Sequence, residues 1–184
     1  LNISGTLYTW TNNNTATGLG SASTGNIASF TTTNTTNAAI ISTVTLTPSY
    51  ANAGITCPGS AQTFTITVNP KPNVTDPTDQ VVCVGASTAV TFVSPLNVSG
   101  TLYSWTNNNT ATGLSSASTG NILSFTTTNT TNAAIISTVT LTPSYANAGI
   151  TCPGSAQTFT ITVNPKPNVT DPTDQVVCVG ASTA

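Results

Sequence analysis

The feature that most constrains the fold of this 184-residue chain is an internal repeat with a period of 95 residues. Residues 1–89 align without gaps with residues 96–184. The two copies differ at four pairs of positions: Ile3 and Val98, Thr9 and Ser104, Gly20 and Ser115, and Ala28 and Leu123. This period exceeds the roughly 20–50 residues of a solenoid repeat and suits a small domain that folds on its own. The chain is therefore expected to be part of a tandem array of domains.

The charged residues mark the boundary between repeats. All six lie in two copies of a proline-rich segment, with Lys71, Asp76 and Asp79 in the first copy and Lys166, Asp171 and Asp174 in the second. Three prolines within eight residues exclude an interior strand or helix and favour a stiff connector. The sequence thus predicts three parts. Residues 1–70 are the C-terminal part of a repeat without its opening strands, 71–165 are one complete repeat, and 166–184 are the first strand or strands of the next.

Each repeat has the pattern of β-strands. Residues 158–163 alternate threonine with Phe159, Ile161 and Val163, which is the period of a half-buried strand. Further strands are expected at 135–142, ending before Pro143, and at 90–93 and 101–105. Asparagine- and glycine-containing segments between them suit turns. The sequence predicts an all-β chain of tandem immunoglobulin-like β-sandwich domains, with about seven strands in each.

The composition excludes most catalytic and nucleic-acid-binding functions. The chain has no His, Arg or Glu and only two Lys and four Asp, with a net charge of −2. General acid–base catalysis and a serine triad lack their usual base, and two lysines cannot neutralise a phosphate backbone. No apolar run is long enough to span a membrane. The chain is predicted not to be an enzyme, and neither nucleic acid nor membrane insertion is expected.

Two cysteines per repeat suggest disulfides in an extracellular protein. Cys83 and Cys152 are the candidate pair within the complete repeat, with Cys57 and Cys178 pairing outside the fragment. The competing pairs are Cys57–Cys83 and Cys152–Cys178 across the linkers, and free thiols are the third alternative. In a simple immunoglobulin-like topology Cys83 and Cys152 lie near opposite ends, whereas a disulfide needs Cα atoms within about 7 Å.

The linker aspartates are weak candidates for calcium ligands. Asp76, Asp79, Asp171 and Asp174 could supply carboxylate oxygens at the domain junctions, and calcium prefers oxygen ligands. The simpler interpretation is a solvated linker whose few charges favour solubility. No cofactor is predicted.

Two groups of residues are candidates for recognition of a sugar or a surface. Tyr103 and Trp105 share one face of a strand; they either belong to the core, as is common in sandwiches, or form an exposed stacking platform. The threonine-rich run 126–132 and its earlier copy could bind a surface through hydrogen bonds or could simply be a hydrated strand face.

The chain as a whole resembles a known family. The resemblance is carried by residues 79–85, 103–109, 119–122, 149–154 and 157–167, which look like the PKD-like repeats of giant cell-surface proteins of the Bacteroidota, including gliding-motility adhesins of the SprB type. It implies an immunoglobulin-like sandwich, export by type IX secretion and a place on the cell surface. It transfers no catalytic or ligand-binding residue.

These observations predict a structural role. The chain is expected to be a stalk or filament segment of a long, repetitive bacterial cell-surface adhesin, extending an adhesive region or forming an extracellular fibre. The alternative is a carbohydrate- or surface-binding adhesin module. The expected partners are copies of itself, in tandem or in a fibre, with surface polysaccharide as a further candidate. We expect the sequence to be a window on a continuous filament; the alternative is that its two ends complement one another between chains.

Overall fold

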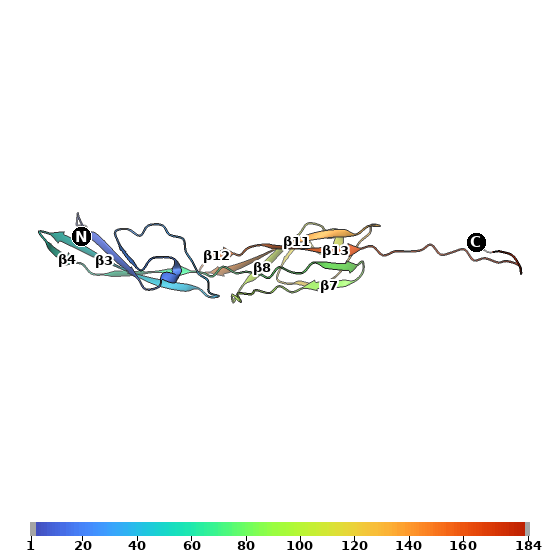
Figure 1. Cartoon of the computed structure of the whole chain (residues 1–184), viewed down its shortest axis with the longest axis horizontal. Helices are drawn as coiled ribbons and strands as arrows, with labels where there is room; N and C mark the ends of the chain where they lie inside the picture. The colour runs from blue at the N-terminus through green and yellow to red at the C-terminus, as the bar shows by residue number, and fades with distance from the viewer. Residues whose placement is uncertain (1–2, 183–184) are drawn as a thin grey trace.

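The computed structural model describes residues 3–182. Two β-rich units lie end to end, and an extended tail continues along the same long axis towards the C-terminus (Figure 1). The first unit contains β1 (Leu7–Asn12), β2 (Ala22–Thr24), β3 (Ile40–Asn52), β4 (Ile55–Pro58) and β5 (Gln62–Val68) in one sheet, with a short 3-10 helix at Thr15–Thr17.

The second unit contains eight strands among the described residues: β6 (Gln80–Cys83), β7 (Ser87–Val90), β8 (Leu102–Asn107), β9 (Ala117–Thr119), β10 (Ile122–Thr126), β11 (Ile135–Asn147), β12 (Ile150–Pro153) and β13 (Gln157–Asn164). The larger sheet has the order β6-β13-β11-β8-β9, with β12 paired to β11, and β7 pairs with β10 in a second, smaller sheet. Within residues 3–182, β6 and β13 are the only strands that pair in parallel. The predicted all-β sandwich is confirmed.

The core of the second unit follows from the alternation in its strands. In β13, Phe159 is 2% exposed and Ile161 and Val163 are fully buried, whereas the threonines between them remain partly exposed. These side chains pack with Val139, Leu141 and Trp105 from β11 and β8 and with Val90 from β7. Each of these strands therefore buries one face in a core that lies between the two sheets.

The strands predicted at 101–105 and 158–163 are present as β8 and β13, whereas the other two predicted strands differ from those of the structure. The segment 135–142 is part of β11, but the strand continues through Pro143 to Asn147. Pro143 is tolerated because β13 pairs with β11 only as far as Leu141, and β12 pairs with β11 only from Ser144 onward. The missing proline N–H therefore lies where the neighbouring strand changes. The strand predicted at 90–93 is instead β7, which ends at Val90.

The first unit is an open version of the same fold. Its part of the sequence has no counterpart of β6 and β7, and residues 27–31, which correspond to β10, form no strand. The buried core cluster is reduced to Trp10, Leu19 and Val44. Phe64 is 44% exposed, although its counterpart Phe159 is almost fully buried. The absent strands thus leave one face of this core uncovered.

The segment 166–184 was predicted to contain the first strands of a further repeat. Its described part, residues 166–182, contains no strand. The corresponding residues of the second unit form β6 by pairing with β13 of their own repeat. The tail follows β13 and extends away from it (Figure 1), so strand formation there requires a partner sheet from beyond the second unit.

Candidate functional site at the junction between repeats

The linker between the two repeats is folded onto the second repeat. Pro70 and Pro72 are fully buried, and Val74 is 6% exposed. The carbonyl oxygen of Pro72 lies where a Cβ on Gly154 would be, and Pro143 lies on the same side of that glycine. Because only a glycine leaves this space, the β12–β13 loop forms a seat for the proline-rich linker.

Hydrogen bonds hold the next part of the linker. The Asn73 Oδ1 atom accepts from the Ser94 hydroxyl at 2.9 Å and from the Leu96 backbone N–H at 3.1 Å. The Thr75 N–H donates to the Val93 carbonyl at 2.8 Å. The segment before β8 is therefore fixed to the linker although neither forms a regular strand there.

Asp79 fixes the point where the linker becomes a strand. One of its carboxylate oxygens accepts from the backbone N–H of Thr160 in β13 at 2.6 Å, and β6 then pairs in parallel with β13 from Gln80 onward. A further bond joins the two repeats directly: the Asn147 Nδ2 donates to the Asn69 Oδ1 at 2.8 Å. The junction thus has a defined geometry and is not a free tether.

The four aspartates considered as calcium ligands lie in different surroundings. Asp79 is used in the bond to Thr160, and Asp76 lines a shallow surface pocket with residues of β7. Asp171 and Asp174 lie in the exposed tail. Among residues 3–182 there is no group of three or more His, Cys, Asp or Glu side chains that could hold a metal ion. The linker carboxylates are therefore not brought together as a calcium site.

The cysteines are also kept apart. Cys83 pairs with Asn164 at one end of the large sheet, and Cys152 pairs with Tyr145 at the other end. Along β11 the two positions are separated by about ten residues, or about 33 Å, which is far beyond the reach of a disulfide. The candidate bridge Cys83–Cys152 is absent for this reason, and Cys57 and Cys178 are also free thiols in the described chain.

The predicted aromatic platform lies in the core. Trp105 is 4% exposed and its copy Trp10 is 6% exposed. Tyr103 is half-buried, and its ring lies 5.6 Å from that of Phe92, between centroids. Burial raises the pKa of the Tyr103 hydroxyl, and a hydrogen bond with Ser94 partly offsets this. These rings cover the interior and are not an exposed stacking surface.

The asparagine-rich turns have a structural role that sequence reasoning did not assign. The side chain of Asn107 is 7% exposed; it donates to the carbonyls of Asn109 and Leu114 and accepts from the Asn109 N–H. Asn109 caps a short 3-10 helix at Thr110–Thr112. In the threonine-rich run, Asn129 donates to the carbonyls of Ala133 and Val163. The density of Asn and Thr was the available signal, because these side chains replace backbone partners in irregular segments.

The comparisons agree with this architecture. The sequence model of the PKD-like domain family matches residues 1–72 and 80–167, so the chain belongs to this family. No curated protein matches the chain. PKD-like domains are commonly extracellular and are typically structural or adhesive modules without a catalytic role. Within residues 3–182, none of the helices has the length and apolar character needed to cross a bilayer.

Proposed function

We propose that this chain is a segment of an extracellular stalk, in which PKD-like domains joined by docked linkers transmit tension and hold an adhesive region away from the cell. The observation that carries the proposal is the burial of Pro70, Pro72 and Val74 against the second repeat. A linker that is folded into the next domain costs free energy to bend, so consecutive domains keep a fixed direction.

The register of the junction also gives the advance per repeat. Asn147 lies at the end of β11 and donates a hydrogen bond to Asn69 of the first repeat. The counterpart of Asn69 in the second repeat is Asn164, which lies beside the start of β11. One repeat therefore advances by about the length of β11, which has 13 residues and spans about 40 Å. A long array of such units would be a thin rod.

The resemblance to SprB-type repeats supports a more specific setting. We infer a repetitive bacterial adhesin that is exported by type IX secretion, acts at the cell surface in gliding motility, and has copies of the same domain as its neighbours. The alternative of a carbohydrate-binding module loses its main support, since Trp10 and Trp105 are buried.

Small-angle X-ray scattering on this chain and on a chain lengthened by one 95-residue repeat tests the stalk. The expected result is a rod whose maximum dimension grows by about 40 Å per added repeat. The control is Pro70→Gly with Pro72→Gly, which loosens the linker and should shorten the average dimension. An added repeat that leaves the maximum dimension nearly unchanged would show that the domains fold back on one another and would overturn the proposal.

A further inference from the structure

We propose that a cavity beside β9 and β10 of the second repeat is a binding subsite for a neutral sugar residue of a polysaccharide. The cavity has a volume of about 300 Å³, and all the residues that line it lie between Trp105 and Phe125, inside the complete repeat. This binding activity goes beyond the proposed stalk, because it gives the side of the repeat a recognition function of its own.

The floor of the cavity is apolar and belongs to the core. Trp105, Leu114 and Ile122 line it and are 4%, 4% and 2% exposed. Trp105 lies on β8 in the larger sheet and Ile122 on β10 in the smaller one. The cavity therefore opens between the two sheets at their edge, and its floor can cover the C–H groups of a sugar ring.

Polar groups surround this floor. Four exposed hydroxyl side chains line the cavity: Ser115, Ser118, Thr119 and Ser124. A hydroxyl can both donate and accept a hydrogen bond. The side chain of Asn121 also lines the cavity, and its Oδ1 atom accepts from the Phe92 N–H at 2.9 Å. That bond holds the amide in place, so its NH₂ group is a fixed donor for a ligand.

The wall of the cavity also contains a buried donor that has no partner. The indole Nε1–H of Trp105 is buried and forms no hydrogen bond with the residues that the structure describes. An unsatisfied buried donor is costly, so a ligand hydroxyl that reaches this group would recover a hydrogen bond. Trp105 acts here through its ring N–H and not through an exposed ring face, and its burial therefore does not count against this site.

The lining favours an uncharged ligand that is rich in hydroxyl groups. No charged side chain lines the cavity, and an ionic ligand would lose hydration there without gaining a counter-charge. A sugar ring has hydroxyls at its rim and C–H groups on its faces, which matches polar groups around an apolar floor. A peptide strand is a poorer match, because β9 is an edge of only three residues and offers little main-chain pairing.

The differences between the two repeats are concentrated at this cavity. The copies differ at four pairs of positions, and two of these pairs correspond to lining residues: Gly20 with Ser115, and Ala28 with Leu123. The three floor residues are identical in the two copies. Side chains that vary around an unchanged floor would alter the relative affinity for different sugars, so the two repeats are expected to differ in preference.

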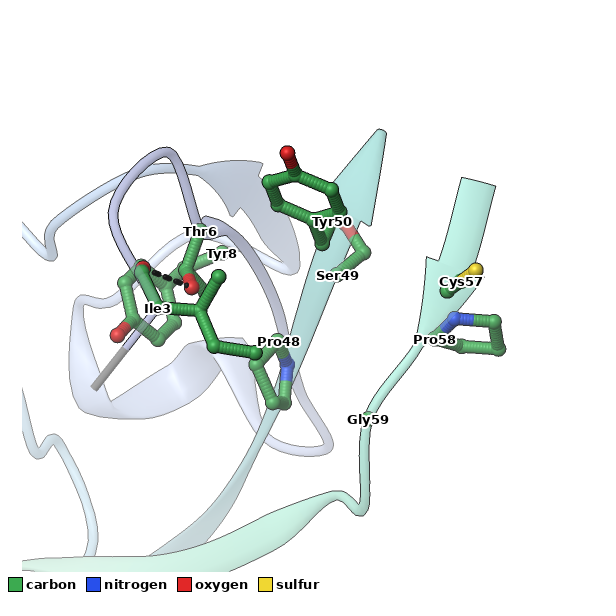
Figure 2. Close-up of a pocket in the computed structure, with 9 residues that line it drawn as sticks. All are labelled: Ile3, Thr6, Tyr8, Pro48, Ser49, Tyr50, Cys57, Pro58 and Gly59. Atoms are coloured by element: carbon green, nitrogen blue, oxygen red, sulfur yellow. Dashed lines mark hydrogen bonds between the residues drawn. The ribbon is translucent and has the colours of Figure 1, made fainter. Parts of the chain in front are cut away.

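A cavity of about 490 Å³ in the first repeat has a different origin. Pro48, Tyr50 and Gly59 line it beside β3 and β4 (Figure 2). Gly59 corresponds to Gly154, which lies against the Pro72 carbonyl of the linker in the second repeat. This cavity is therefore the counterpart of the linker seat, whereas no segment of residues 71–165 fills the cavity beside β9 and β10.

Titration of the Trp10→Phe chain with methyl glycosides tests the proposal. Trp105 is then the only tryptophan, so a single indole N–H resonance in the ¹H–¹⁵N spectrum reports on the cavity. The probes are methyl glycosides of neutral hexoses, deoxyhexoses and N-acetylhexosamines. We expect at least one of them to shift this resonance saturably, with a Kd of about 1 mM. Repetition of such a weak site along a stalk would raise the overall avidity for a polysaccharide.

Two variants distinguish the cavity from the rest of the surface. Ser115→Gly combined with Leu123→Ala gives the second repeat the lining of the first, and we expect binding about tenfold weaker, since a hydroxyl and an apolar contact are lost. Ser118→Lys places a long side chain at the opening and should abolish binding. Ser99→Lys is its control, because Ser99 is an exposed turn residue outside the cavity, and it should leave the Kd unchanged.

Two results would overturn the proposal. One is the absence of a saturable shift with every glycoside up to about 50 mM, far above the expected Kd. The other is a shift that persists unchanged in Ser118→Lys. Neither result affects the proposed stalk, which is tested separately by the growth of the scattering dimension with each added repeat.

Discussion

Asparagine side chains form hydrogen bonds with backbone groups in the irregular parts of each repeat, where no neighbouring strand supplies a partner. Asn107 forms three hydrogen bonds at a buried position, and Asn108 accepts from the Thr138 N–H at 2.7 Å. A loop crossing the end of a sandwich has carbonyls and N–H groups that no strand can satisfy. The planar amide supplies both a donor and an acceptor there, which explains an Asn-rich sequence with few charges.

Replacing Asn107 should therefore be costly. Asn107→Ala removes the partners of the Leu114 and Asn109 carbonyls and of the Asn109 N–H, and we expect the second repeat to lose about 2–4 kcal/mol of unfolding free energy. Denaturant titration followed by tryptophan fluorescence measures the loss. Asn132→Ala, at an exposed position of the threonine-rich run, is the control and should change stability by less than about 0.5 kcal/mol. Equal losses in the two variants would contradict the assigned role.

Gly154 tests the linker seat at the level of a single methyl group. Gly154→Ala places a Cβ against the carbonyl of Pro72, so the linker must move, and we expect a loss of about 1–3 kcal/mol in the second repeat. Gly59→Ala is a matched control. A Cβ on Gly59 would contact Pro48, which corresponds to Pro143, but it would contact no atom of a linker. The difference between the two variants measures linker docking, and a difference near zero would mean that the linker is not held there.

At the scale of the element, strands with internal alternation were the easiest to predict. β13 was correctly predicted because Phe159, Ile161 and Val163 alternate with threonine. β6 was not predicted as a separate strand, because Gln80–Cys83 is short and its stability comes from parallel pairing with a strand about 80 residues later. The linker contacts could not be predicted either. A Pro-Lys-Pro sequence indicates stiffness, but the seat beside Gly154 depends on packing between distant segments.

The comparison of β10 with residues 27–31 shows that strand formation here depends on a partner. The two segments differ in sequence only at Ala28 and Leu123, yet only β10 is a strand, paired with β7. Hydrogen exchange should therefore be slower for the backbone amides at Ile122 and Phe125 than at Ile27 and Phe30. Ala28→Leu, which makes the two segments identical, should leave the exchange at 27–31 fast. Slow exchange in that variant would indicate that the side chain, and not the partner, decides the structure.

For the whole molecule, two nearly identical sequences differ in how much core they bury. The second unit buries eleven hydrophobic residues in one cluster, and the first unit buries three. The difference arises from residues 71–95, which supply β6, β7 and Phe92 to the second unit alone. Stability along an array of this kind is therefore set at the junctions, because each repeat is completed by the segment that enters it.

This unequal burial predicts two separate unfolding transitions, and the chain provides one tryptophan per repeat to report them. Trp10→Phe leaves Trp105 as the reporter of the second unit, and Trp105→Phe leaves Trp10 for the first. Since fully burying a large apolar side chain contributes about 1.5–3 kcal/mol, we expect the first unit to be less stable by at least about 3 kcal/mol. Its denaturant midpoint should be correspondingly lower.

A synthetic peptide with the sequence of residues 70–93 carries the linker, β6, β7 and Phe92. Adding it should raise the Trp10 midpoint in proportion to the logarithm of its concentration, while the Trp105 midpoint stays constant. Coincident midpoints for the two reporters without peptide would contradict this account, because they would mean that the open repeat is as stable as the complete one. The result decides whether the entering segment stabilises each domain or merely connects it to its neighbour.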